Sequence, residues 1–240
     1  SLSSRPMSRV IKPLTEMGAN IEASNGMLPI SLSPASFQKQ YTYELPVASA
    51  QVKSSILLAG LAAGIGIEII EPVQTRDHTE RMLKNFGADL EITSKGTKKV
   101  IQLSPSNHLQ AKDYTVVGDI SSAAFLIVGA LISNSPGLEI TNVGMNPSRT
   151  GVLEALQKMG ANIEVKNQRL ESGEPCADLE VKESVLRGVE LSGDIIPNII
   201  DEIPILSIAA AFAEGETVIR DATELRVKES DRLKAVSDGF

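Results

Sequence analysis

The densest group of ionisable side chains lies at 224–234, in the segment ELRVKESDRLK. If a helix begins at about Lys228, then Lys228 and Arg232 share one face at i and i+4, with Glu229 beside them. Two cations on one turn repel each other unless an anion binds between them. The alternative is a solvated helix face with ion pairs such as Glu229 with Arg232, which is the ordinary explanation of a charge run.

Two adjacent acids, Asp201 and Glu202, occupy the segment IIDEIPI at 199–205, between a proline-containing loop and an apolar helix. A carboxylate packed against that much apolar surface would be partly desolvated, which raises its pKa and suits it to proton transfer near neutral pH. The alternative is that both acids cap the helix N-terminus. We predict capping for Glu202, and this segment alone leaves Asp201 open between the two roles.

A helix start is predicted in LPVASAQVKSSILLAGL at 45–61. Ser49 is placed as the N-cap, with Gln51 and Lys53 in or near the first turn. The free N–H groups and the positive end of the helix dipole favour a phosphate or carboxylate there. Most N-cap serines only cap, so this segment alone predicts ordinary capping.

Arginines precede two further predicted helices, Arg5 and Arg9 in RPMSR and Arg76 in TRDHTER. Arginine suits bidentate recognition of carboxylate and phosphate, although solvated surface charge explains most single arginines. His78 is predicted to begin a helix or hold a partner rather than bind metal, because the other histidine, His108, falls in a polar loop and no zinc-type cluster occurs. Together, the cationic sites, helix starts and acids indicate an anionic ligand and proton transfer.

The elements that must position these side chains repeat along the sequence. LTEMGANIE at 14–22 recurs as LKNFGADLE at 83–91 and as LQKMGANIE at 156–164. Each copy predicts an amphipathic helix that ends at its glycine, because glycine tolerates the left-handed conformation, followed by a strand. The glycines are Gly18, Gly87 and Gly160.

A second pattern, an Ala-rich apolar helix followed by a glycine and a strand, alternates with the first. Its copies are 54–70, 122–140 and 203–219, with turns at Gly66, Gly137 and Gly215. These helices are apolar nearly all round, so we expect them to be buried. The two patterns recur in phase and predict a unit of roughly 70 residues that packs on copies of itself.

The 240 residues, 42% hydrophobic and 22% charged, predict a soluble globular chain of one large domain or two halves. Its apolar stretches fall short of the roughly 18 residues that a membrane span needs. A net charge of -7 and 3% aromatic residues argue against nucleic-acid binding. The single cysteine, Cys176, favours a reducing cytoplasmic setting. We place a crossover between two lobes, 1–117 and 118–240, near Gly118, where glycine permits a hinge-like turn.

Seven sequence blocks, in this order, resemble motifs of the 5-enolpyruvylshikimate-3-phosphate synthase family. Their residues are more similar to the bacterial class II branch of that family than to class I. They span nearly the whole chain, which makes them more specific than any short motif. The blocks are RPMSR at 5–9, LPVASAQVKSSILLAGL at 45–61, TRDHTERML at 75–83, GDISSAAF at 118–125, NPSRTGVLEAL at 146–156, IDEIPILSIAAAFAEG at 200–215 and LRVKESDRLKA at 225–235.

The resemblance implies an α/β (α+β) fold, a two-lobed inside-out α/β prism built from βαβαββ units, with both lobes incomplete in these residues. It implies transfer of the enolpyruvyl group of phosphoenolpyruvate to the 5-hydroxyl of shikimate 3-phosphate, a shikimate-pathway step towards aromatic amino acids and a glyphosate target. No metal or organic cofactor, nucleic acid or membrane partner is expected. A cytoplasmic monomer acting on small molecules is the expectation for the full-length protein.

The resemblance also assigns roles to residues of the first lobe. Arg5 would bind the phosphoenolpyruvate side, and Gln51 would lie between the two substrates. Ser49 and Ala50 at the helix start, with Arg76, would hold shikimate 3-phosphate. Ala50 stands where some members carry a second serine, so its contact could only be made by the backbone, and Thr75 stands where this block usually has serine.

In the second lobe, the resemblance implies that Asp201 takes the proton of the attacking hydroxyl. Lys228 and Glu229 would assist proton transfer at the methylene carbon, and Arg232 would clamp the phosphoenolpyruvate anion. An addition–elimination needs such a base, an acid and cations. Because these residues follow Gly118 whereas Arg5, Gln51 and Arg76 precede it, the site is expected between the lobes, closed by lobe movement.

The family's opening segment, with Lys-Ser and Arg ligands, and its closing segment, with His-Arg and Lys ligands, do not occur in these residues, so we expect a fragment with negligible turnover by itself.

Two alternative functions are the rivals of this interpretation. One is the sibling transferase acting on UDP-N-acetylglucosamine, which should carry a catalytic cysteine in a first-lobe loop, and the other is a non-catalytic repeat scaffold. Cys176 lies after the crossover, in an acidic polar stretch.

Overall fold

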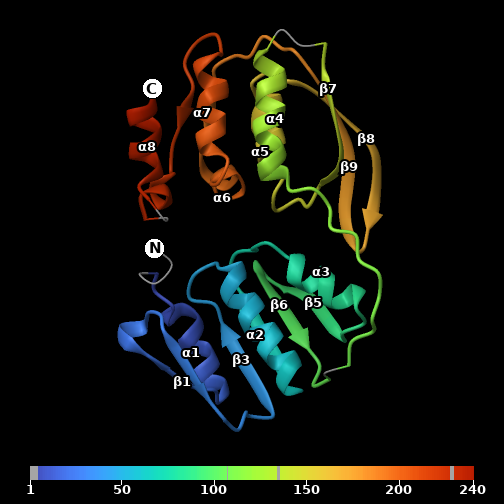
Figure 1. Ribbon diagram of the computed structural model, residues 1–240, viewed down its shortest axis with the longest axis vertical. Coiled ribbons are helices and arrows are strands. Elements are labelled where there is room, and N and C mark those ends of the chain that lie inside the picture. Colours follow the sequence, from blue (N-terminus) through green and yellow to red (C-terminus); the bar gives the residue numbers. More distant parts are fainter. Residues whose placement is uncertain (1–4, 107, 134–135, 228–229) are drawn as a thin grey trace. The chain divides into compact units, whose positions relative to one another are not determined.

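The computed structural model describes residues 5–106, 108–133, 136–227 and 230–240. The chain forms two compact units, unit 1 (Ser1–Asp113) and unit 2 (Tyr114–Phe240) (Figure 1). This division precedes the crossover predicted near Gly118. The N–H of Gly118 donates to the Asn142 carbonyl oxygen (2.7 Å), and its own carbonyl accepts from the Gly144 N–H (2.8 Å). The residue at which we predicted a hinge is therefore held by strand-like pairing inside unit 2.

Unit 1 contains one complete βαβαββ run, preceded by a helix and a two-stranded ribbon. The run forms a sheet of order β3-β4-β6-β5, in which β3 and β4 are parallel and the other pairs are antiparallel. Helix α2 packs on β4 and β6 over an apolar core. The elements are α1 (Ser8–Met17), β1 (Asn20–Ala23), β2 (Ile30–Ser33), β3 (Gln40–Glu44), α2 (Ala50–Ala63), β4 (Gly66–Glu71), α3 (His78–Asn85), β5 (Leu90–Lys95) and β6 (Lys98–Leu103).

Unit 2 repeats this topology. The parallel bridge at Gly118 stands where β3 stands in unit 1, and the sheet order β7-β9-β8 matches β4-β6-β5. A parallel pair, β10 with β11, follows on either side of α7. The elements are α4 (Ile120–Ile132), β7 (Leu138–Gly144), α5 (Gly151–Lys158), β8 (Asn162–Glu171), β9 (Glu174–Lys182), β10 (Glu190–Leu191), α6 (Ile196–Ile199), α7 (Ile203–Ala211), β11 (Val218–Ile219) and α8 (Arg232–Gly239).

The glycines of the first repeat all adopt the predicted left-handed conformation, with φ of 116° at Gly18, 87° at Gly87 and 91° at Gly160. The turn predicted at Gly66 is wrong. Helix α2 ends instead at Gly64, with φ 65°, and Gly66 begins β4 opposite Gln40 of β3. The register of the parallel pair requires extended backbone at Gly66, so the reversal occurs earlier.

The apolar helices are buried only in part, which corrects the expectation that they are enclosed. Within unit 2, α4 packs on α7, β7 and β9. Nevertheless, Leu58 on α2, Phe125 on α4 and Phe212 after α7 are 51%, 62% and 64% exposed. One side of each helix faces a sheet or helix of its unit, and the opposite side has no second layer in the described part of the chain. No described helix is long and apolar enough to cross a membrane.

Candidate functional site

The start of α2 has the geometry predicted for it. Ser49 is the N-cap in extended backbone, and its Oγ accepts from the Val52 N–H at 3.4 Å, a long hydrogen bond. Ala50 opens the helix, and Gln51 is exposed on its first turn. A helix start with a neutral cap keeps a positive dipole end and free N–H groups, which suit an anion.

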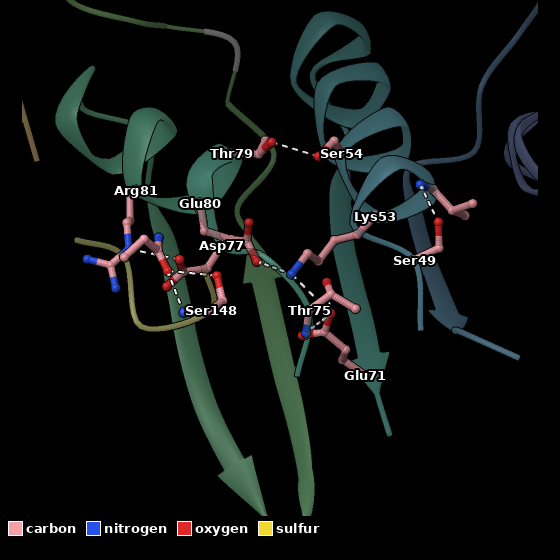
Figure 2. Close-up of polar contacts among 12 residues, drawn as sticks. Ser49, Lys53, Ser54, Glu71, Thr75, Asp77, Thr79, Glu80, Arg81 and Ser148 are labelled. Carbon is pink, nitrogen blue, oxygen red and sulfur yellow. Dashed lines mark hydrogen bonds and ion pairs between the residues drawn. The ribbon is translucent and has the colours of Figure 1, made fainter. Parts of the chain in front are cut away.

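Lys53 lies one helical turn after Ser49 and is fully buried. Its Nζ is 3.0 Å from Oε1 of Glu71 and 2.6 Å from Oε1 of Glu80, as Figure 2 shows. Glu71 ends β4 and Glu80 lies in the first turn of α3. These three residues, the buried triad, join three elements of unit 1. Lys53 therefore faces carboxylates of its own chain rather than an anion cradle.

The loop that carries Arg76 is attached to the buried triad. The Thr75 N–H donates to Oε1 of Glu71 at 3.1 Å, and the Thr75 hydroxyl makes a very short hydrogen bond to the same oxygen (Figure 2). Arg76 is half-buried and follows directly in the chain. Because Lys53 of α2 and Thr75 meet at one carboxylate, the helix start and the Arg76 loop are held as neighbours.

The buried triad holds one ammonium group against two carboxylates. Burial raises the pKa of Glu80 above its usual value, and the charge of Glu71 raises it further, whereas attraction to Lys53 opposes the shift. Oε2 of Glu80 is buried and has no hydrogen-bond partner among the described residues. Glu80 therefore keeps its proton to a higher pH than an exposed glutamate does.

In unit 2, Asp201 and Arg232 lie together. Nη1 of Arg232 is 3.0 Å from Oδ1 of Asp201, and both side chains are half-buried. Asp201 lies in the turn between α6 and α7, and Arg232 is the first residue of α8. The pair brings a candidate base and a candidate anion-binding cation into contact.

The predicted helix start at about Lys228 is wrong. Asp231 is in extended backbone and N-caps α8 by accepting from the Lys234 N–H at 3.0 Å, so the helix begins at Arg232. Lys228 and Glu229 fall outside the described residues. The side-chain cap at Asp231 fixes the first residue of α8 as Arg232.

Glu202 does not cap its helix as predicted. It occupies the N-cap position of α7 and is buried, but its side chain makes no capping hydrogen bond. Its Oε1 instead accepts a very short hydrogen bond from the hydroxyl of Ser121 on α4. The carboxylate therefore ties α7 to α4, a partner that the local sequence does not reveal.

The N-terminus of α4 is capped by a carboxylate that is itself paired with an arginine. Asp119 caps it by accepting from the N–H groups of Ser121 and Ser122, and Arg149 Nη2 lies 2.5 Å from Asp119 Oδ1. Arg149 also donates to Ser121 Oγ at 2.6 Å. Partial burial raises the pKa of Asp119, but the hydrogen bond from Ser122 and the charge of Arg149 outweigh it, so the pKa lies below its usual value.

Three of the four remaining candidates lie near helix starts in unit 1. Arg5 is exposed before α1, Arg9 is exposed in the first turn of α1, and His78 begins α3 as predicted. His108 is exposed in the loop after β6. In residues 5–106, 108–133, 136–227 and 230–240, no group of three His, Cys, Asp or Glu side chains could hold a metal ion.

Sequence reasoning missed the buried triad and the Asp119–Arg149 pair. One signal for the triad was present: Lys53 is the only charged residue of α2, an otherwise apolar helix. A single charge on such a helix must be paired when the helix packs on a sheet. Its partners could not be named, because they lie on β4 and α3.

Comparison with known proteins agrees with this architecture. The EPSP synthase (3-phosphoshikimate 1-carboxyvinyltransferase) family model matches residues 1–240. A 3-phosphoshikimate 1-carboxyvinyltransferase of Gloeothece citriformis is 54% identical over 239 residues, covering 99% of this chain and 53% of the relative. The chain thus spans about half the length of the curated relatives it matches.

Solved structures give the same result. EPSP synthase from Acinetobacter baumannii superposes with a TM-score of 0.86 at 48% identity, over 100% of this chain and 54% of that chain. The enolpyruvyl transferase NikO from Streptomyces tendae shares the fold, with a TM-score of 0.67 at 19% identity over 92% of this chain and 52% of that one. The chain has the α/β inside-out fold of enolpyruvyl transferases and belongs to the EPSP synthase family.

Proposed function

We propose that the protein containing this chain transfers the enolpyruvyl group of phosphoenolpyruvate to the 5-hydroxyl of shikimate 3-phosphate, with release of phosphate. The observation that carries the proposal is the open start of α2. It has a neutral Ser49 cap, an exposed Gln51 and an arginine loop attached through Glu71 and Thr75. Helix N–H groups and a guanidinium together suit a phosphate monoester.

In this proposal, unit 1 supplies the shikimate 3-phosphate contacts. Ser49, the backbone of Ala50 and Arg76 bind the phosphorylated substrate, and Gln51 lies between the two substrates. Arg5 binds the phosphoenolpyruvate side, and its exposed position before α1 leaves it accessible. The support is the match of these positions to the family's motifs together with the local geometry of α2.

Residues of unit 2 handle protons and charge. Asp201 accepts the hydroxyl proton while the hydroxyl oxygen attacks C2 of phosphoenolpyruvate, and Glu229 with Lys228 protonates the methylene carbon. Loss of a proton from that carbon and departure of phosphate then restore the double bond. Arg232 holds the phosphoenolpyruvate anion, and its contact with Asp201 supports a role for both groups at one place.

Two observations favour this reaction over the rivals. The only cysteine, Cys176, is buried in β9 of unit 2, whereas the UDP-N-acetylglucosamine enzyme would need a reactive first-lobe cysteine. Against a passive scaffold, the match to the EPSP synthase family over residues 1–240 and the relatives named 3-phosphoshikimate 1-carboxyvinyltransferase favour an enzyme. We place the reaction in the reducing cytoplasm, on the strength of the cysteine content.

The test is to incubate the full-length protein with both substrates and to monitor product formation by phosphorus NMR. Arg76→Ala should raise KM for shikimate 3-phosphate by about 10- to 100-fold, the value of a charge-assisted hydrogen bond. Asp201→Asn should lower kcat by about 100-fold or more. Arg220→Ala, which removes an exposed partner of Glu190, is the control and should change neither. Absence of product with the unmodified protein would refute the proposal.

A further inference from the structure

We propose that Lys53 is a positioning residue, which through Glu71 and Glu80 holds the first turn of α2 and the Arg76 loop in one fixed arrangement. The inference rests on the proposed function, because the groups so arranged are those proposed to bind shikimate 3-phosphate. Lys53 itself does not touch that substrate. Its ammonium group is fully buried and bound to two carboxylates of unit 1.

The first step links Lys53 to the helix start. The Lys53 N–H donates to the Ser49 carbonyl oxygen at 3.1 Å, so its backbone belongs to the turn that carries the cap. A second link lies beside it, where Ser54 Oγ and Thr79 Oγ1 share a hydrogen bond of 2.6 Å (Figure 2). The start of α2 is therefore attached to α3 by two consecutive side chains.

The second step links the buried triad to the loop. Glu71 accepts from the Thr75 backbone N–H immediately before Arg76, and Glu80 lies in the first turn of α3 immediately after the loop. Both ends of the 72–77 segment are thus connected to the same ammonium group. Loss of that group would leave both ends without their common anchor.

The third step concerns charge. Removal of Lys53 would leave Glu71 and Glu80, each about as buried as Lys53, facing each other without a cation. Two buried carboxylates without a cation either admit water and separate, or share a proton. In both cases β4 and the Thr75–Arg76 loop lose their common contact with the start of α2. An exposed pair such as Lys98 with Glu44 has no such consequence.

A displacement of about 1 Å at a binding group can reduce catalysis by about 100-fold. We therefore expect Lys53→Met to raise KM for shikimate 3-phosphate by about 10- to 100-fold. KM for phosphoenolpyruvate should rise by a clearly smaller factor, since of the residues proposed beside that substrate only Gln51 belongs to the turn of α2 that the buried triad holds. A variant that merely unfolds would lower kcat with the active fraction and leave both KM values unchanged.

The experiment uses the full-length protein and four forms: unmodified, Lys53→Met, Lys98→Met as the exposed control, and the triple variant Lys53→Met/Glu71→Gln/Glu80→Gln. The triple variant removes the uncompensated carboxylates while keeping their shape. It should regain the melting temperature of the unmodified protein in part, yet keep a raised KM for shikimate 3-phosphate. Hydrogen exchange at the Thr75 amide should be about tenfold faster or more in Lys53→Met and unchanged in Lys98→Met.

If Lys53→Met does not fold, Glu80→Gln replaces it, because the amide retains a hydrogen bond to Lys53. It should raise the same KM by a smaller factor. Equal KM values in the unmodified protein and the variants, with turnover intact, would overturn the positioning role alone. An unmodified protein that makes no product would overturn the proposed function, and the positioning role with it.

Discussion

Helices α2 and α4 occupy the same place in the two βαβαββ runs, yet their N-termini are satisfied differently. Helix α2 begins with the neutral cap Ser49, which accepts one backbone hydrogen bond, whereas α4 begins with the carboxylate of Asp119, which accepts two and also pairs with Arg149. A helix start favours negative charge. Unit 2 supplies that charge from its own chain, and unit 1 leaves the position to the anion proposed above.

The cations near these helix starts also differ in burial. Lys53 in the first turn of α2 is fully buried between two carboxylates, whereas the Arg149 side chain at the start of α4 is 17% exposed. The shared topology therefore reproduces strands and packing without reproducing the polar chemistry. The repeat unit therefore fixes where a helix starts, and individual side chains decide what that start can bind.

The largest expected effect comes from Lys53→Met, which leaves two buried carboxylates without a cation. Unit 1 should lose about 3–5 kcal/mol of unfolding free energy, measured by hydrogen exchange of the β4 and β6 amides. The matched substitution Lys98→Met removes an exposed partner of Glu44 and should cost about 1 kcal/mol or less. Similar losses in both variants would contradict the contrast between buried and exposed pairs.

The two helices should respond oppositely to alanine in place of glycine. A Cβ at Gly60 of α2 would lie 2.2 Å from Cγ1 of buried Ile67, so Gly60→Ala should destabilise unit 1 by about 1–3 kcal/mol. A Cβ at Gly129 of α4 meets no atom within 4 Å, so Gly129→Ala should stabilise unit 2 by about 0.5–1 kcal/mol. Urea unfolding of each variant measures both, and changes of the same sign would refute the comparison.

The two caps should separate stability from binding. Asp119→Ala should destabilise unit 2 by about 1–2 kcal/mol, because Asp119 accepts from two backbone N–H groups and pairs with Arg149. Ser49→Ala should cost unit 1 about 0.5 kcal/mol, because Ser49 accepts one long hydrogen bond from Val52. Calorimetry with shikimate 3-phosphate should reverse the order, with Ser49→Ala weakening binding by about 2- to 10-fold. A larger loss of affinity in Asp119→Ala than in Ser49→Ala would show that the anion binds at α4 and not at α2.

The smallest expected effect is a difference in pH dependence. The pKa of Glu80 is raised in the folded state, so its contribution to stability is full below the unfolded pKa and declines as pH rises through the folded pKa. The pKa of Asp119 is lowered, so its contribution is full above the unfolded pKa and declines as pH falls through the folded pKa. NMR amide signals of each unit, followed in urea across pH, measure both.

Substitution identifies the groups responsible for these trends. Glu80→Gln should remove the decline that begins above the ordinary glutamate pKa, and Asp119→Asn should approach the unmodified protein as pH falls below the ordinary aspartate pKa. Unchanged slopes after either substitution would show that another carboxyl group produces the trend.

The sequence was sufficient for features set within a few residues. The helix–glycine–strand repeats at Gly18, Gly87 and Gly160 are confirmed, as are the Ser49 cap and the start of α3 at His78. The prediction from the sequence failed where a second structural preference shifted the end of an element. The Asp231 cap moved the start of α8 to Arg232, and strand register moved the turn after α2 to Gly64.

The repeated α/β elements and the family can be inferred from the sequence alone, because periodicity, caps and ordered motif blocks are properties of neighbouring residues. Three contacts depend instead on the folded chain: Lys53 faces Glu71 and Glu80, Glu202 bonds to Ser121 instead of its own helix, and Arg232 meets Asp201. Each of these contacts joins elements distant along the chain. Such partners are chosen by sheet register and helix packing, which bring together charges that no local pattern connects.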